Sequence, residues 1–298
     1  MHDAHAAILN PQAAAAQEAP PADRPLKVIR PASLSVSTVV AGISTLVRQY
    51  DLLYTLTLFR LNIRYKQSAL GWLWAGLQPV ALMTIYTLIF SRFAKVSSEG
   101  IPYPLFVFSA LLPWIFFSSA ITNAVHGLVS YPALLTKMYF PREIIPLSYV
   151  AAALVDLAIS LSILACLMLY YRTPLSWNAL YAVPILAALC IFTTAVALVL
   201  SSIQVRFRDI GVALPLLLQV WMFGTPIVYS MAAVPVRYRY AFLLNPVATF
   251  IASFREVLVH GLAPDKTTLA AATVISILCL TAAYAYFKSA ESNMADSV

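Results

Sequence analysis

The chain has 298 residues, of which 61% are hydrophobic and 10% charged, and its mean hydropathy is +0.81. These values exclude an ordinary soluble domain of this length and indicate one membrane domain. The net charge of +7 does not indicate nucleic-acid binding, because positive charge in a membrane protein usually marks loops that face anionic lipid.

The first 48 residues differ in composition from the rest. Residues 1–31 are rich in alanine and proline and contain no apolar run long enough for a signal-peptide core. Residues 36–47 are apolar but too short to span a membrane, so we place them at or near its surface. We therefore expect residues 1–48 to form a cytoplasmic tail that is largely disordered.

Residues 49–70 are predicted to form an interfacial amphipathic helix. The segment mixes apolar residues with Arg60, Arg64 and Lys66, and the two arginines are one helical turn apart on one face. This pattern is typical of a helix that lies in the membrane surface with its cations toward anionic headgroups. An ordinary packed amphipathic helix is the alternative.

Six nearly uncharged windows follow, and we assign residues 71–288 to a transmembrane domain. A helix needs about 20 apolar residues to cross the hydrocarbon core, and every window exceeds that length. The windows are residues 67–91, 101–136, 144–171, 173–205, 210–236 and 267–287. The predicted fold is thus an all-α integral membrane protein with six transmembrane helices.

The positions of lysine and arginine predict the orientation. With six spans both termini share a side, and if that side is cytoplasmic it holds 12 of the 19 basic residues. Cytoplasmic loops carry an excess of Lys and Arg, so we expect both termini inside, with a cytoplasmic tail at residues 289–298. The loops at residues 131–146 and 204–209 then also face the cytoplasm.

The outer segment before the last span covers residues 236–261, and residues 244–261 of it are predicted to form a re-entrant helical hairpin. Its residues are too apolar for water and too few to cross the membrane, and Asn245-Pro246 breaks any helix near the middle. The Arg255-Glu256 pair would be costly at mid-membrane but not near headgroups. Arg255 is our candidate contact for an anionic headgroup, with a purely structural contact as the alternative. A plain amphipathic outer loop is the alternative to the hairpin.

Asp156 is the acid that lies well inside a predicted span. Counting from residue 145 at about 1.5 Å per residue, its depth is roughly 16 Å, close to mid-membrane. An acid at that depth must face protein or water. A hydrogen bond between helices and a polar contact in a channel are both open.

Four blocks of the sequence, residues 70–92, 140–156, 206–230 and 244–261, resemble the membrane subunit of bacterial type-2 ABC exporters of surface polysaccharides such as O-antigen, capsule or teichoic acid. The resemblance covers residues 50–288 in the expected order. It implies a homodimer in the bacterial inner membrane that moves a lipid-linked polysaccharide. It also implies two ATP-binding cassette subunits, which bind ATP and Mg, so no cofactor is expected in this chain.

The resemblance also places the ATPase-docking helix in residues 131–146. The residues expected to contact the ATPase are Lys137, Tyr139, Phe140, Pro141, Arg142 and Glu143, with Lys137, Arg142 and Glu143 exposed. A short basic loop that merely follows the charge rule is the alternative.

A polysaccharide channel is expected to be lined by aromatic rings, because sugar C–H faces stack on them and rings make no fixed ionic contacts. The resemblance favours rings in the first and fifth spans. Aromatic residues also fill helix interfaces and mark membrane surfaces. The candidates are Trp72, Trp74, Tyr86, Phe90, Trp114, Phe116, Phe117, Asp156, Trp221, Phe223 and Tyr229.

Catalytic and metal-binding patterns do not favour an enzyme. The sequence has no GxxxxGK[ST], GxSxG or HExxH motif, and the three cysteines lie in apolar windows without metal-ligand spacing. We therefore expect a transport subunit without catalytic residues or metal. The alternatives are a type-2 ABC permease for a drug or small lipid, and a membrane-embedded transferase.

Overall fold

A computed structural model describes residues 49–66, 68–130, 141–231, 234–235, 237, 242 and 245–294. They all belong to one compact unit that starts at residue 32. Every element in these ranges is helical. The predicted tail at residues 1–48 lies outside the described residues.

Eleven helical segments follow one another in the described part of the chain. Two α-helices, α4 and α11, continue directly as π-helical turns, and a short 3₁₀ helix, η2, leads into α8. The segments are α3 (Tyr50–Tyr65), α4 (Leu73–Tyr86), η1 (Thr87–Phe93), α5 (Tyr103–Val129), α7 (Ile144–Tyr170), η2 (Trp177–Tyr181), α8 (Ala182–Arg206), α9 (Asp209–Phe223), α11 (Pro246–Arg255), η4 (Glu256–His260) and α12 (Lys266–Met294).

Five helices of the described chain are long and apolar enough to cross a membrane. They are Leu73–Phe93, Tyr103–Val129, Ile144–Tyr170, Trp177–Arg206 and Lys266–Glu291. They coincide with five of the six predicted windows, so the prediction of an all-helical, multi-pass membrane protein is confirmed. The window at residues 210–236 contains only the 15-residue α9, which is shorter than a full span.

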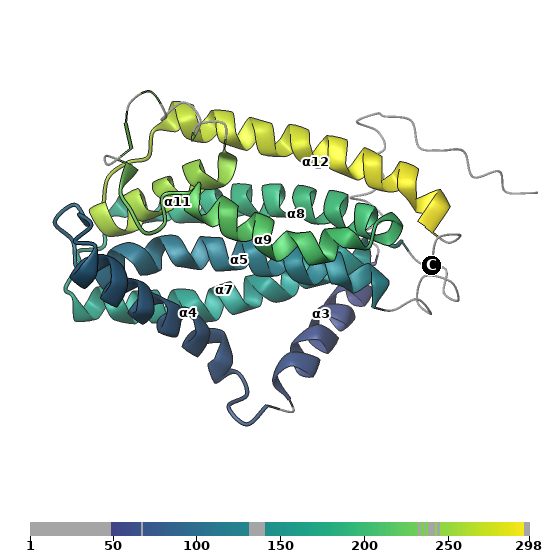
Figure 1. Cartoon of the computed structure of the whole chain (residues 1–298), viewed down its shortest axis with the longest axis horizontal. Coiled ribbons are helices and arrows are strands. Elements are labelled where there is room, and N and C mark those ends of the chain that lie inside the picture. Colours follow the sequence, from purple (N-terminus) through teal and green to yellow (C-terminus); the bar gives the residue numbers. More distant parts are fainter. Residues whose placement is uncertain are drawn as a thin grey trace, which may run out of the picture. The chain divides into compact units, whose positions relative to one another are not determined.

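Helix α5 forms the centre of the bundle (Figure 1). Most of its residues are buried, and it packs against α4, α7, α8, α9 and α11. Its fully buried side chains include Phe106, Phe108 and Phe117. Lipid tails are as apolar as these rings, so close van der Waals packing rather than the hydrophobic effect holds such a helix against its neighbours.

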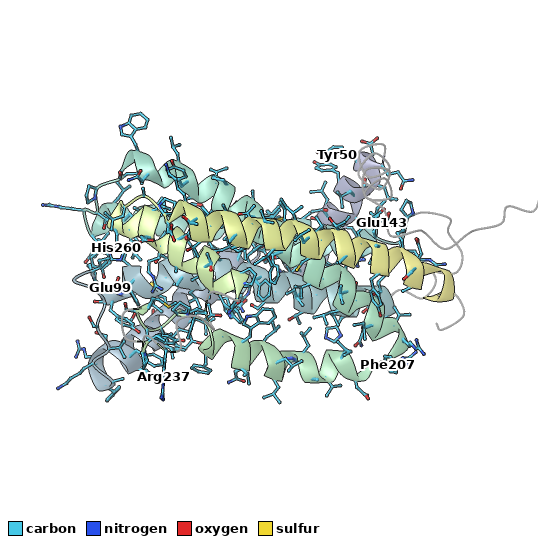
Figure 2. All side chains as sticks on the ribbon, turned by 90° about the horizontal axis from the view of Figure 1, so that it is seen from above. Tyr50, Glu99, Glu143, Phe207, Arg237 and His260 are labelled. Atoms are coloured by element: carbon cyan, nitrogen blue, oxygen red, sulfur yellow. The ribbon has the colours of Figure 1, made fainter. Side chains whose placement is uncertain are left out.

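The two ends of the bundle collect different loops. Figure 2 shows Tyr50, Glu143 and Phe207 at one end and Glu99 and His260 at the opposite end. We call these the Glu143 end and the Glu99 end. The last turns of α12 also lie at the Glu143 end (Figure 1).

The chain between α8 and α12 passes from one end of the bundle to the other. Arg206 ends α8 at the Glu143 end, whereas the Asn178 side chain at the start of α8 donates a hydrogen bond to the Gly261 carbonyl at 2.8 Å. Arg206 and Gly261 are therefore separated by about the length of α8, which is about 37 Å at 1.5 Å per residue. Helix α9 covers part of it, and a non-helical stretch with buried residues 225–228 follows.

Helices α3 and α4 diverge from one another, and a turn at residues 68–72, where Gly71 has a positive φ of 51°, precedes α4 (Figure 1). Helix α3 packs against α7, and α4 against α5 and α7. At the other end of the chain α12 continues to Met294, so the expected C-terminal tail at residues 289–298 is helical in its first part.

Candidate functional site

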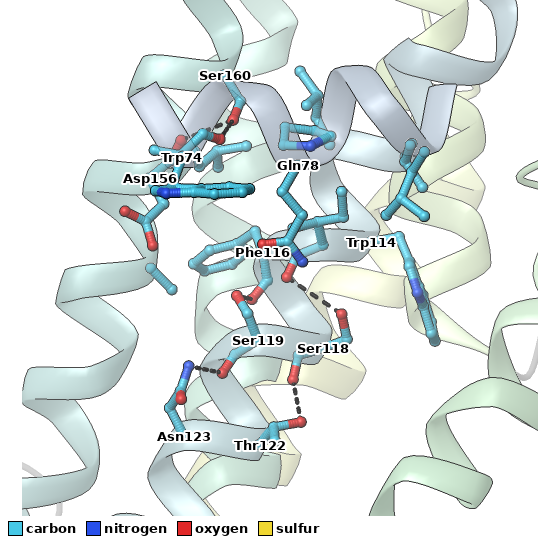
Figure 3. A pocket seen from close by; sticks show the side chains of 18 of the residues that line it. Trp74, Gln78, Trp114, Phe116, Ser118, Ser119, Thr122, Asn123, Asp156 and Ser160 are labelled. Carbon is cyan, nitrogen blue, oxygen red and sulfur yellow. Dashed lines mark hydrogen bonds between the residues drawn. The ribbon is translucent and has the colours of Figure 1, made fainter. Parts of the chain in front are cut away.

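A cleft lies between α4, α5 and α7, and residues of α3 and α9 also line it. Its volume is about 580 Å³. Five of the predicted channel residues line it, namely Trp74, Tyr86, Trp114, Phe116 and Asp156. Figure 3 shows Trp74, Trp114, Phe116 and Asp156 around the cleft, with Trp74 next to Asp156. The structure thus brings together residues from the first three spans.

One face of α5 forms a polar wall of this cleft. Ser118, Ser119, Thr122 and Asn123 lie at spacings of one, three and four residues and therefore share a face, which Gln78 of α4 approaches (Figure 3). Thr122 donates to the Ser118 carbonyl at 2.8 Å, and Asn123 to the Ser119 carbonyl at 2.7 Å. Their side-chain oxygens keep acceptor lone pairs, so the wall can accept hydrogen bonds from sugar hydroxyls.

Asp156 sits where α3 meets the cleft. Its carboxylate pairs with Arg64 Nη1 at 2.5 Å and accepts a hydrogen bond from the Tyr65 hydroxyl at 2.7 Å. Burial, and then the hydrogen bond to Asp156, raise the pKa of Tyr65 to about 12, so this hydroxyl stays a donor at neutral pH. Asp156 therefore makes the predicted hydrogen bond between helices, and it also lines the cleft.

The prediction that the cations of α3 point toward headgroups does not hold for Arg60, which is buried. Arg60 is 7% exposed and its guanidinium lies 4.4 Å from the centre of the Tyr149 ring on α7, while Arg64 turns to Asp156. The exposed face of α3 carries Tyr54, Phe59 and other apolar side chains instead. The two arginines share a face on which Arg60 is buried, whereas the Arg64 side chain is 41% exposed. Lys66 ends the helix.

The other channel candidates lie outside the cleft. Trp72 stacks on Tyr65 with ring centres 4.7 Å apart, and Phe90 packs edge-on to Tyr86. Trp221 of α9 packs edge-on against the stacked rings of Phe117 and Phe192, and its indole donates to the Asn245 side chain at 3.1 Å. Phe223 is exposed, and the Tyr229 hydroxyl donates to its carbonyl at 2.8 Å.

Helix α11 begins inside the bundle and returns to the Glu99 end. Asn245, which precedes it, contacts Trp221 and Thr225 near the end of α9, and Pro246 is the first residue of the helix. Nine of the ten residues of α11 are buried. Its backbone is therefore shielded by protein, as a broken helix at membrane depth requires.

Arg255 at the end of α11 is buried rather than open to the outside. It is 5% exposed, its Nη2 donates to the Pro226 carbonyl at 2.5 Å, and its guanidinium lies 4.0 Å from the centre of the Phe106 ring. These contacts tie α11 to α5 and to the stretch after α9, which favours the structural alternative for this residue.

Acidic groups and a histidine surround a hollow of about 290 Å³ at the Glu99 end, beside Arg255. His260 Nε2 lies 3.1 Å from the Glu99 carboxylate, and Ser230 donates to the same carboxylate. Burial is the main cause that raises the pKa of Glu256 above its usual value, Glu99 and Asp265 add to it, and His260 opposes it.

At the Glu143 end a buried ion cluster joins the start of α7 to α12. Glu143 is 1% exposed, accepts a hydrogen bond from the Tyr284 hydroxyl at 3.1 Å and pairs with Lys288 Nζ at 2.8 Å. Lys288 also pairs with Glu291 at 2.9 Å, and Arg142 Nη1 donates to the Glu291 carbonyl at 2.5 Å. We call these five residues the α12 clamp.

The clamp corrects the expectation that Arg142 and Glu143 are exposed. Arg142 is half-buried, and Glu143 is buried because α12 brings a cation beside it. Pro141 is half-buried next to them. Lys137, Tyr139 and Phe140 lie outside the described residues.

Sequence reasoning missed the polar wall of α5 and the α12 half of the clamp. The wall had a readable signal, because four polar residues at helical spacing interrupt the apolar window at residues 101–136. The clamp had none, since Tyr284 and Lys288 are more than 140 residues from Glu143.

Comparison with known proteins finds one matching family and several relatives. Residues 51–259 match the family described as ABC-2 type transporter. The chain is 32% identical over 251 residues to the O-antigen export system permease protein RfbA of Myxococcus xanthus, which covers 83% of this chain and 95% of that protein. It is also 32% identical over 215 residues to an O-antigen export system permease protein RfbA of Klebsiella pneumoniae, covering 71% of this chain and 82% of that protein.

Proposed function

Because the chain belongs to the ABC-2 type transporter family, we propose that it is the membrane subunit of an ATP-driven exporter that moves a lipid-linked polysaccharide of the O-antigen class across the bacterial inner membrane. The observation that carries the substrate class is the cleft. It combines a polar α5 face with aromatic side chains in a membrane-embedded bundle, and the relatives are permeases of O-antigen export systems.

The chemistry of the cleft suits a chain of sugars better than an apolar drug. Hydroxyl and amide oxygens of the α5 wall can accept hydrogen bonds from sugar hydroxyls, and the exposed Trp74 offers a ring face to sugar C–H groups. A net hydrogen bond between neutral groups contributes only about 1 kcal/mol, so each contact breaks easily. Asp156 is already neutralised by Arg64, so it does not hold the polymer by charge.

Two copies of the chain together form the path in this proposal. Helices α4 and α9 both contribute residues to the lining of the cleft and expose apolar side chains, among them Leu73, Leu77 and Leu216. A second copy placed against these faces would close the cleft into a channel. The homodimer would bind two ATP-binding cassette subunits, which hold ATP and Mg.

The topology we propose has six crossings, with α9 and residues 224–231 as the fifth. This is supported by the passage of the chain from Arg206 to Gly261 along the length of α8. The distribution of basic residues favours a cytoplasmic Glu143 end, and with it cytoplasmic termini. We place the re-entrant hairpin on the periplasmic side, with α11 as its returning helix.

In this proposal the ATPase subunits bind at the Glu143 end and transmit their movements to the helices there. We assign the docking helix to residues 131–146, which lead directly into α7. The α12 clamp joins this segment to the last span through Glu143 and Lys288. A displacement of the docking helix would therefore move α7 and α12 together, rather than α7 alone.

Stimulation of ATP hydrolysis by substrate tests this function. The complex of this chain with its ATPase subunits, in lipid nanodiscs, should hydrolyse ATP faster with an undecaprenyl-linked glycan than with undecaprenyl diphosphate alone. Hydrophobic small molecules should have no comparable effect. Stimulation by small molecules and not by the glycan would replace polysaccharide export with export of a drug or small lipid.

A further inference from the structure

The connection between α7 and α8 exposes large apolar side chains at the Glu99 end. It contains the short helix η2 (Trp177–Tyr181), and the Trp177 side chain is 87% exposed. Leu175 and Leu180 on either side of it are exposed as well, and we call these three residues the η2 patch. Contact with water is unfavourable for a contiguous apolar patch, so exposure of this kind indicates a partner surface.

Lipid is the partner that the neighbouring residues of the chain indicate. The patch lies between two helices that are long and apolar enough to cross a membrane, one that ends at Tyr170 and one that begins with η2 itself. Leu169 and Tyr170 at the end of α7 and Val183 in the first turn of α8 are exposed too. Lipid must cover the exposed apolar side chains of these two spans, and the η2 patch continues them along the chain. The patch belongs to neither α4 nor α9, the helices proposed to meet a second copy.

The length of α7 places the η2 patch at the level of the headgroups. Helix α7 has 27 residues and is about 40 Å long, whereas the hydrocarbon core is about 30 Å thick. If the core is centred on the helix, Tyr170 lies about 5 Å beyond its edge. Tryptophan and tyrosine are enriched at this depth, because the ring is apolar and its N–H or O–H group stays hydrated. The exposed cation of Arg172, between Tyr170 and Trp177, also suits headgroups rather than hydrocarbon.

Helix η2 is joined to the end of the segment formed by α11 and η4. The Asn178 side chain donates a hydrogen bond to the Gly261 carbonyl at 2.8 Å. Gly261 directly follows η4 and has a positive φ of 66°, and a Cβ atom on it would lie 3.2 Å from the Cβ of Ser176. Ser176 in turn accepts a hydrogen bond from the backbone N–H of Asn178 at 3.3 Å. Conformation and close approach both require glycine here, so the backbone after η4 lies directly against η2.

We propose that η2 is a membrane anchor in the headgroup layer at the Glu99 end, and that it holds the end of the α11–η4 segment at this depth. Trp177 is the side chain that contacts lipid, and Asn178 and Gly261 form the link. The anchor is independent of what the protein exports and of the side of the membrane that the Glu99 end faces.

Tryptophan fluorescence of the full chain in lipid nanodiscs tests the contact with lipid. The signal of Trp177 is the difference between wild type and Trp177→Phe. Phosphatidylcholine brominated near the carbonyl end of its acyl chains should quench this difference strongly, and lipid brominated near the methyl end or aqueous iodide should quench it weakly. The difference between wild type and Trp114→Phe is the matched control, because Trp114 is buried in α5 and should be quenched by neither lipid.

Two quenching results would overturn the anchor. Strong quenching of Trp177 by iodide, without quenching by either brominated lipid, would place the patch in water. Protection of Trp177 from all three quenchers would mean that protein covers the patch, for example a second copy of the chain.

Labelling of a cysteine next to Gly261 tests the hold on the α11–η4 segment. Leu262 is exposed, and Leu262→Cys is made in a chain whose three native cysteines are replaced by alanine. Trp177→Ser should increase its labelling rate by a water-soluble maleimide severalfold, and Trp177→Tyr should restore the slow rate, because tyrosine also prefers the headgroup layer. Tyr286→Ser removes an exposed aromatic ring of α12 and is the control, with no expected effect. Equal rates in Trp177→Ser and Tyr286→Ser would overturn the hold on this segment even if Trp177 contacts lipid.

A pair of glycines tests the link itself. Gly261→Ala and Gly100→Ala both place a side chain at a positive φ, but a Cβ on Gly100 would meet no atom within 4 Å. Gly261→Ala should therefore lower the thermal midpoint further than Gly100→Ala and should speed labelling at residue 262. Equal midpoints with unchanged labelling would show that the contact with Ser176 holds nothing in place and would overturn the link.

Discussion

Removal of the cation from the α12 clamp should destabilise the bundle and weaken its link to the ATPase. Lys288→Met keeps the length of the side chain but leaves Glu143 as a buried carboxylate with one hydrogen bond, from Tyr284. Breaking a buried ion pair by removing one partner costs about 3–5 kcal/mol. Because the Lys288 side chain is 21% exposed and water can reach it, we expect about 2–3 kcal/mol.

The assay is thermal unfolding of the purified permease in detergent, followed by copurification with its ATPase subunits. The midpoint of Lys288→Met should fall by roughly 5 °C, given the usual relation between free energy and melting temperature. Lys266→Met removes an exposed lysine at the other end of α12 and should change nothing. Glu143→Gln combined with Lys288→Met removes both charges and should recover most of the lost stability.

Two results would refute this reasoning. One is equal midpoints for Lys288→Met and Lys266→Met. The other is a double variant that is no more stable than Lys288→Met alone, because the cost would then not come from an uncompensated carboxylate.

Four shorter predictions concern other parts of the molecule. Phe140→Ala with Arg142→Glu should leave the permease in the membrane but detach or uncouple the ATPase, and unchanged copurification with unchanged export would contradict the docking assignment. Asp156→Asn should assemble normally, since its amide still bonds to neighbouring groups, but should slow export; normal export would limit the residue to a structural role. Glu256→Gln should raise the thermal midpoint at pH 7, because the pKa of Glu256 is raised in the folded state and its ionised form therefore destabilises that state. The wild type should become more stable as the pH falls and Glu256 takes up a proton, and the variant should lack this gain. An equal difference between variant and wild type at pH 4 and pH 7 would exclude this cause. Single cysteines at residues 256–260 should be labelled from outside only, and those at the buried positions of α11 should be labelled weakly; labelling from the cytoplasm would mean an additional crossing.

The spans were predictable because their signal is local. An apolar run of sufficient length must form a helix in lipid, where backbone groups find no water. The early end of α9, in the predicted fifth span, also had a local signal in the sequence. Helix α9 ends before Gly224, Thr225 and Pro226, and a proline disfavours helical geometry in the residue before it. The prediction extended the fifth apolar window to residue 236 because it counted only uncharged residues and ignored this proline.

For the candidate site, the sequence predicted the types of residue that line the cleft but not which individual residues line it. Aromatic candidates were chosen by residue type, and Trp74 and Trp114 line the cleft while Trp72 and Trp221 pack elsewhere. Residue type does not say which side of a helix meets a cavity and which meets another helix. That choice depends on packing between spans that are distant in the sequence.

The orientation of α3 shows the same limit for charges. The spacing of Arg60 and Arg64 fixes one shared face, and this was read correctly. It does not say whether the face meets headgroups or protein, because the partners Tyr149 and Asp156 belong to α7, about 90 residues away. A buried acid in a span is a signal that a cation must come to it, and Asp156 could have pointed to α3.

Reconstituted transport tests the central claim most directly. The permease and its ATPase subunits would be placed in liposomes that carry an undecaprenyl-linked glycan only in the leaflet facing the ATPase, and a lectin in the opposite compartment would report its arrival. Polysaccharide export predicts ATP-dependent lectin binding that is lost without ATP hydrolysis and reduced by Asp156→Asn. ATP hydrolysis with no glycan reaching the lectin, in a complex that exports hydrophobic small molecules, would contradict it.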